Sequence, residues 1–476
     1  MKRIIIFLLA ITLVGCGGAN STSQPAQSTE TIGLVERPTV AAGQATAEPS
    51  NPTTQPTTAI QTSAWSVIFQ NSSTGSVEAV DSNGTFYQLA DPTIAERRLI
   101  WTPSPDGKRI AVIVLEGAGS PKMQGFDHAS LWVVGVDESQ PTKLLNLFDG
   151  QAAQTSTGFT ASDYPSAIAN PYFQRLNWSA DNAIIVTSAH EGNVDLYAVN
   201  PDNGTVRRLT NTPAIEYAAT LSPDGTQLAF ATAGTFGTGG GFGDPNTWRM
   251  KLSDAQAWQI NPDGNESGAQ VIGWLDANRV IVSTSNNGNG QMTYWLADDR
   301  SMLQSMTAGA GTGYINAGKL VFINSSGRNG GIVSTWDGTT AESTPLNLRA
   351  EELSVNPYGE GFVACQQTAR TLWRNGENMT ITPGSCQDLA WSQTGRLALG
   401  GNTAGSIIEP DGGVREAAIS NGAILAGWHD NTVYYFAPSG NDAWQLYSYD
   451  ANTTDSAVAI GEPVKGQIVA PRLITK

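Results

Sequence analysis

The sequence predicts an all-β protein in which four-stranded antiparallel sheets repeat around one closed ring. The main observation is a hairpin phrase, "IEYAATLSPDGTQLAF" at positions 215–230, in which strands at Tyr217 to Leu221 and Gln227 to Thr232 flank the turn Ser222-Pro223-Asp224-Gly225. Proline presets φ in such a turn, the Asp side chain bonds back to nearby amides, and Gly accepts a positive φ. Related phrases recur at 99–114, 175–188 and 389–401, and a unit that returns roughly every 40 to 50 residues indicates a repeat architecture.

Composition supports the same fold class. Charged residues make up 14% of the chain, which also holds 51 glycines and 13 tryptophans, and no sustained helical periodicity follows the N-terminal segment. Low charge with many glycines is typical of β repeats joined by tight turns. The formal net charge of −16 repels phosphate backbones, so we expect no nucleic-acid partner.

The N-terminus has the features of a secretion signal. Lys2 and Arg3 precede a short apolar run from Ile4 to Val14, which falls short of the roughly 20 residues that a spanning helix needs. The run ends in "LVGC", which resembles the lipobox of bacterial lipoproteins. This resemblance implies that residues 1–16 are a lipoprotein signal peptide and that Cys16 carries lipid chains that bind the protein to a membrane. We therefore expect an extracytoplasmic protein, lipid-anchored at the cell membrane or envelope. An ordinary cleaved leader with a coincidental cysteine is the alternative.

A polar segment at 17–63 follows the leader. It is rich in Ser, Thr, Gln, Ala and Pro and has no aromatic residue. Such a segment buries too little apolar surface to offset chain entropy, and its prolines favour extended conformations. We interpret 17–63 as a disordered tether that precedes a folded domain at 64–476.

Short β runs broken by Gly, Asn, Asp and Pro fill the rest of the chain. They divide into about nine units of up to four strands each. Two of these units could form one irregular sheet, so eight is the alternative. The units begin near Trp65, Arg97, Tyr172, Ile215, Ala269, Gly313, Glu351, Cys386 and Ala423.

The best units carry an SPDG turn, a second strand similar to "LAF", a third similar to "LYAV" and a closing "RRLT". They resemble the PD40 or TolB-type, WD40-like β-propeller repeat. The resemblance implies a single β-propeller of eight or nine four-stranded antiparallel blades. Radial stacking buries both faces of each blade, which explains nearly continuous apolar strands such as "RIAVIV" at 109–114.

The first unit lacks an inner strand, and the chain ends in an unassigned strand-like run from Gln467 to Ile474. We predict that this run completes the first blade and closes the ring, which leaves no free sheet edge.

Two cysteines remain in the propeller, Cys365 and Cys386. They lie in neighbouring units, so they form either a disulfide or two buried thiols. No Cys or His lies nearby at ligand spacing, so we expect no metal.

No catalytic motif accompanies the ring. The histidines, His128, His190 and His429, are isolated in sequence, and neither HExxH nor G-x-S-x-G occurs. We expect a monomer without a cofactor or enzymatic activity.

Three long insertions at 116–129, 148–171 and 233–247 join second to third strands or consecutive blades, so they share one face of blades two to four. Long loops with aromatic residues over a rigid ring are where binding usually resides. We predict that a protein, peptide or glycan partner contacts Phe126, Phe159, Tyr164, Tyr172, Phe236, Phe242 and Trp248. Packing of these aromatics against the ring is the alternative.

The leading functional hypothesis is therefore a non-catalytic binding or scaffold protein. One alternative is an extracytoplasmic enzyme acting on glycans or esters through Asp127, His128 or Asp163 at the channel mouth. Another is an envelope assembly factor of TolB type, which the repeat resemblance implies and which fold alone does not establish.

Overall fold

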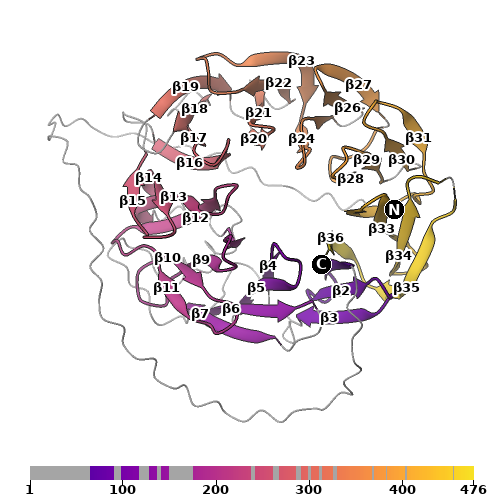
Figure 1. Cartoon of the computed structure of the whole chain (residues 1–476), viewed down its shortest axis with the longest axis horizontal. Helices are drawn as coiled ribbons and strands as arrows, with labels where there is room; N and C mark the ends of the chain where they lie inside the picture. Colours follow the sequence, from indigo (N-terminus) through magenta and orange to yellow (C-terminus); the bar gives the residue numbers. More distant parts are fainter. Residues whose placement is uncertain are drawn as a thin grey trace, which may run out of the picture.

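The protein is a ring of nine four-stranded antiparallel sheets (Figure 1). The computed structural model describes residues 65–475, apart from 91–97, 117–127, 137–140, 149–174, 237–241, 261–266, 286–290, 298–301, 310–312, 325–329, 367–368, 382, 402–404 and 454. The expected signal peptide, Cys16 and the tether lie outside the described residues. Within the described part, no helix has the length and apolar character needed to cross a membrane.

Blades one to five follow the chain in order. Their strands are β36 (Ile468–Thr475), β1 (Trp65–Asn71), β2 (Val77–Asp81) and β3 (Phe86–Ala90); β4 (Arg98–Pro103), β5 (Arg109–Glu116), β6 (His128–Gly135) and β7 (Thr142–Phe148); β8 (Asn177–Trp178), β9 (Ile184–Ser188), β10 (Asp195–Val199) and β11 (Val206–Arg208); β12 (Ile215–Leu221), β13 (Gln227–Phe236), β14 (Phe242–Lys251) and β15 (Ala257–Gln259); β16 (Ser267–Trp274), β17 (Val280–Ser285), β18 (Gln291–Ala297) and β19 (Met302–Gly309).

Blades six to nine repeat the pattern. Their strands are β20 (Gly313–Asn316), β21 (Lys319–Asn324), β22 (Gly331–Trp336) and β23 (Thr344–Ala350); β24 (Glu352–Val355), β25 (Phe362–Gln366), β26 (Ala369–Arg374) and β27 (Glu377–Ile381); β28 (Leu389–Trp391), β29 (Leu397–Leu399), β30 (Ser406–Ile408) and β31 (Val414–Glu416); β32 (Ile424–His429), β33 (Thr432–Pro438), β34 (Ala443–Asp450) and β35 (Val458–Lys465). The nine-blade prediction is confirmed, and the eight-blade alternative is not.

The C-terminal strand β36 is the inner strand of the first blade. It pairs antiparallel with β1, where Trp65 lies opposite Thr475 and Val67 opposite Leu473, with an irregularity between Ile68 and Gln70. Figure 1 shows β36 on the axis side of this blade. The predicted closure by the C-terminal run is confirmed.

The SPDG phrase forms a turn stabilised by its own side chains. In blade four, the Ser222 hydroxyl donates to Asp224 Oδ1 over 2.5 Å and accepts the Gln227 amide over 3.0 Å. Gly225 has a φ of 68°, and a Cβ there would lie 2.7 Å from the Cβ of Ala180 in the preceding blade. In blade three, Asn182 takes the position that glycine holds in the other copies, with a φ of 62°.

The core lies between blades. Leu196, Leu228, Phe230 and Met250 are buried in one cluster that joins blades three and four. Burial of a side chain of this size contributes about 1.5–3 kcal/mol. Because each blade supplies apolar side chains to both neighbours, the ring is one cooperative unit.

A disulfide joins Cys365 of β25 to Cys386, which lies just before β28, so blades seven and eight are covalently linked. Of the two alternatives for these cysteines, the structure contains the disulfide.

Truncation after Gly466 removes β36 and should lower the melting temperature by about 10 °C or more, because β1 loses its inner partner and two blade faces become exposed. Circular dichroism melts measure the change. Val469→Ser alters an exposed side chain of the same strand and should have little effect. An unchanged melting temperature of the truncated protein would contradict the closure.

The double variant Cys365→Ala, Cys386→Ala should lose about 3 kcal/mol of unfolding free energy, because the cross-link constrains a short loop in the unfolded chain. Denaturant titration measures this loss, and adding a reductant to the wild-type protein should reproduce it. Equal midpoints for oxidised and reduced protein would show that the cross-link does not contribute.

Candidate functional site

Most of the predicted contact aromatics cannot be placed. Phe126, Phe159, Tyr164 and Tyr172 lie outside the described residues, as do Asp127 and Asp163 of the enzyme alternative. His128 is described; it opens β6 and is exposed.

The predicted long loop at 233–247 is wrong in its extent. β13 continues to Phe236 and β14 begins at Phe242, and these two residues are register partners. Glycine and threonine in this segment indicate a turn. Backbone pairing between two strands needs no particular side chain, however, and Thr235 and Gly243 are register partners within the hairpin. Trp248 therefore lies within β14, where it is half-buried.

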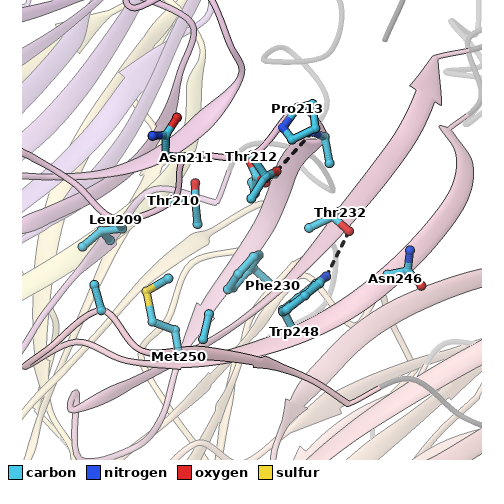
Figure 2. Close-up of a pocket in the computed structure, with 14 residues that line it drawn as sticks. Leu209, Thr210, Asn211, Thr212, Pro213, Phe230, Thr232, Asn246, Trp248 and Met250 are labelled. Atoms are coloured by element: carbon cyan, nitrogen blue, oxygen red, sulfur yellow. Dashed lines mark hydrogen bonds between the residues drawn. The ribbon is translucent and has the colours of Figure 1, made fainter. Parts of the chain in front are cut away.

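Trp248 lines a cavity of about 200 Å³ between blades three and four. The blade-four wall follows from strand alternation and register, since Phe230 of β13 lies opposite Trp248 and Thr232 lies opposite Asn246. The Trp248 indole Nε1 donates to the Thr232 hydroxyl over 3.2 Å (Figure 2). Met250 lies two residues beyond Trp248 on the same side of β14 and extends this apolar wall.

The opposite wall is the link between the two blades, residues 209–214. Its path is set by hydrogen bonds to β10 and the turn before it. The Leu209 amide donates to the Leu196 carbonyl over 2.8 Å, and the Asn193 side chain donates to the Thr212 carbonyl over 3.2 Å. Links between blades emerge on the same face as second-to-third strand connections, so the cavity lies on the face predicted for binding.

Two fully buried acids lie beside this link, Glu216 of β12 and Asp195 of β10. Asp195 is well supplied with donors: the Arg208 guanidinium, the Thr210 hydroxyl at 3.1 Å and the Thr212 amide at 3.4 Å. Glu216 Oε1 accepts the Thr212 hydroxyl. Glu216 Oε2 is buried and receives no hydrogen bond from the described residues.

This arrangement shifts both acids toward the protonated form. Burial, reinforced by the Asp195 carboxylate, raises the pKa of Glu216 well above its usual value of 4.5. Burial also raises the pKa of Asp195, although Arg208 opposes that shift. Two carboxyls in contact hold one proton between them, as like charges at this distance do not both ionise in a buried site.

Another junction between consecutive blades has complementary charges. Near the start of β26 the buried Arg370 donates to the Ser385 carbonyl over 2.5 Å and lies 3.5 Å from Asp388, which precedes β28. There a cation and an acid join consecutive blades. Between blades three and four two acids meet instead; Arg208 pairs with Asp195, and Glu216 has no cation among the described residues.

A neighbouring array resembles a catalytic triad in composition only. Ser188 Oγ lies 2.9 Å from His190 Nδ1, and His190 Nε2 lies 3.8 Å from Glu191. Ser188 is fully buried, and its hydroxyl donates to the Leu147 carbonyl over 3.1 Å. A nucleophile must reach its substrate, and a fully buried hydroxyl does not. The array therefore has a structural role, since the Ser188 hydrogen bond to Leu147 joins blades two and three. Within the described residues no group of three or more Cys, His, Asp or Glu side chains is placed to hold a metal.

No family model matches the chain. A stretch of 79 residues is 32% identical to a protein described as "Protein TolB homolog" from Chlorobium luteolum; the match covers 17% of this chain and 16% of that protein. The likeness to TolB-type propellers is thereby confirmed. This TolB-like chain matches only a small part of its relative's length, so the comparison concerns the repeats and not the whole protein.

Solved structures were also found to be similar to this chain. A eukaryotic initiation factor is similar at a TM-score of 0.50 and 10% identity, over 86% of this chain and 97% of that one. TolB from Acinetobacter baumannii gives a TM-score of 0.31 at 15% identity, covering 86% and 82%. A puromycin-hydrolyzing peptidase from Mycobacterium tuberculosis gives 0.42 at 12%, covering 77% of this chain and 53% of the peptidase. The likeness to the initiation factor, at 10% identity, concerns the fold alone.

Glu216→Gln should stabilise this TolB-like propeller increasingly as pH rises. The stability contributed by protonated Glu216 is fully present below its unfolded-state pKa and is lost as pH rises through the higher folded-state pKa. Glutamine is neutral at every pH. Between the two pKa values of Glu216, the unfolding free energy of the variant therefore rises relative to that of the wild type by up to about 1.4 kcal/mol per pH unit.

Thermal melts between about pH 5 and pH 8 measure this gain. Glu342→Gln, which replaces an exposed acid, serves as the control. A difference between Glu216→Gln and wild type that stays constant or shrinks with rising pH would contradict the shared proton.

Proposed function

We propose that this protein is a surface-anchored, non-catalytic propeller lipoprotein that binds a protein, peptide or glycan on the loop-rich face of blades two to four. The observation that carries the proposal is the cavity beside Trp248, a residue selected from the sequence for this face. Concave, mostly apolar sites with a few polar groups are where ligands usually bind.

The strand ends of blade two support the choice of face. Glu116, His128 and Phe148 flank the connections at 117–127 and 149–174, and by chain topology they lie on the same face as the link 209–214. The opposite face carries the short SPDG turns, whose polar side chains are engaged in the turns themselves. A partner that binds on the face of the link 209–214 does not contact the SPDG turns, which then serve only to hold the blades together.

Localisation outside the cytoplasm agrees with the Cys365–Cys386 disulfide, because disulfides persist in oxidising compartments. The likeness of the repeats to a TolB homolog supports a scaffold role in the cell envelope. A lipid anchor at Cys16 would hold the ring at a membrane while residues 17–63 allow it to reach a partner.

Trp248→Ala should reduce recovery of partner from a membrane extract by about tenfold or more, since truncating a central aromatic contact typically costs at least about 2 kcal/mol of binding energy. Cross-linking followed by affinity purification of the full chain measures recovery. Trp444→Ala is the matched control, because Trp444 is also a half-buried tryptophan on the third strand of its blade, β34. Equal recovery with both variants would place the binding surface elsewhere.

A further inference from the structure

The cavity combines one acid with an apolar wall. Phe230, Trp248 and Met250 form the blade-four wall, and the fully buried Glu216 lies among the lining residues. Figure 2 shows the rings of Phe230 and Trp248 on one side of the cavity and the link residues across from them. A ligand that fits this arrangement has an apolar stem and a head that donates hydrogen bonds.

The size of the cavity restricts the ligand further. At about 200 Å³ it is smaller than the pockets of about 300–1,000 Å³ that hold drug-sized molecules. It therefore admits one side chain of a larger partner. The net charge of −16 favours a basic partner, because complementary charge accelerates encounter.

We propose that this cavity binds a lysine side chain of a protein partner, with the methylene stem against Trp248 and Phe230 and the ammonium at Glu216. The proposal rests on the proposed function and specifies which partner chemistry the face recognises. Lysine fits better than arginine because its ammonium is a compact point charge on a flexible stem, whereas a planar guanidinium requires a fork of two acceptors and Glu216 Oε1 already accepts the Thr212 hydroxyl.

Binding would replace the proton of Glu216 with the ammonium of the lysine side chain. In the free protein Glu216 Oε2 is buried without a hydrogen-bond donor among the described residues, and burial together with Asp195 favours the protonated form of Glu216. A bound ammonium donates to Glu216 instead, so Glu216 ionises and releases its proton to solvent.

The ionisable groups around Glu216 are already paired or remain neutral, so an ammonium can replace a proton only at Glu216. Asp195 is already neutralised by Arg208, which also pairs with Glu191 at 2.9 Å. The nearby Tyr197 stays protonated, since burial raises the pKa of its phenol. Glu216 is therefore the acid of this network that lacks a cation.

The test uses the full-length chain and the peptide acetyl-Gly-Gly-Lys-Gly-Gly-amide. Twin peptides carry norleucine or Nε-acetyl-lysine in place of lysine, and n-butylammonium serves as a free amine. Saturation-transfer NMR ranks affinities, and titration in weakly buffered solution counts protons released. We expect the lysine peptide to bind at least about tenfold tighter than either twin, with release of about one proton near neutral pH.

Glu216→Gln should lower affinity for the lysine peptide by about tenfold, abolish proton release and leave the norleucine peptide unchanged. Glu352→Gln is the matched control, because Glu352 opens the inner strand β24 of another blade and is exposed. Both variants must melt cooperatively, and the thermal melts described above are the measurement that tests this for Glu216→Gln.

Equal affinity for the lysine and norleucine peptides, or no binding of either at millimolar concentration, would overturn the proposal. Binding of n-butylammonium without binding of the lysine peptide would also overturn it and would identify a free amine as the ligand. These failures are distinct from failure of the proposed function, since loss of partner recovery in Trp248→Ala would still locate binding at this face.

Discussion

Face-to-face packing of the blades is the constraint on which the structure depends. A four-stranded sheet with two apolar faces is stable only when both are covered, and in a ring this requires that the last blade meet the first. The pairing of β36 with β1 meets this requirement, and Val67 and Phe69 of the first blade then pack with Phe436 of the ninth. The pairing of β1 with β36 thus closes the ring, and closure keeps both faces of each blade covered.

A recurrent polar contact holds the inner strands in register with one another. A tryptophan near the end of an inner strand donates its indole N–H to a carbonyl of the preceding inner strand, over 3.3 Å, 3.0 Å and 2.9 Å. The pairs are Trp178 to Thr102, Trp274 to Thr220 and Trp428 to Ala390. Trp178 and Trp274 are buried and Trp428 is half-buried, so each contact combines apolar packing with a satisfied donor. The hydrogen bond fixes the orientation of the ring, which apolar packing alone does not.

The ring could be predicted because its determinants are local: turns such as Ser222 to Gly225 set hairpins, and their spacing sets blades. The acid pair could not, because contact between Asp195 and Glu216 depends on how two blades pack. One signal was present, since Asp195 is the first and Glu216 the second residue of strands that are otherwise largely apolar, "DLYAV" and "IEYAATL". The extent of the loop predicted at 233–247 is wrong, because residue preference says little about how far a hairpin extends.

The position of β1 has a mechanical consequence. It is the first described strand, so a pull from the preceding residues enters the ring through it. β1 is hydrogen-bonded on both edges, to β2 and to β36. Because antiparallel hydrogen bonds run perpendicular to the strands, force along β1 loads many of them in shear at once and does not open them singly. A chain held at its N-terminal side thus bears tension at the same blade that closes its ring.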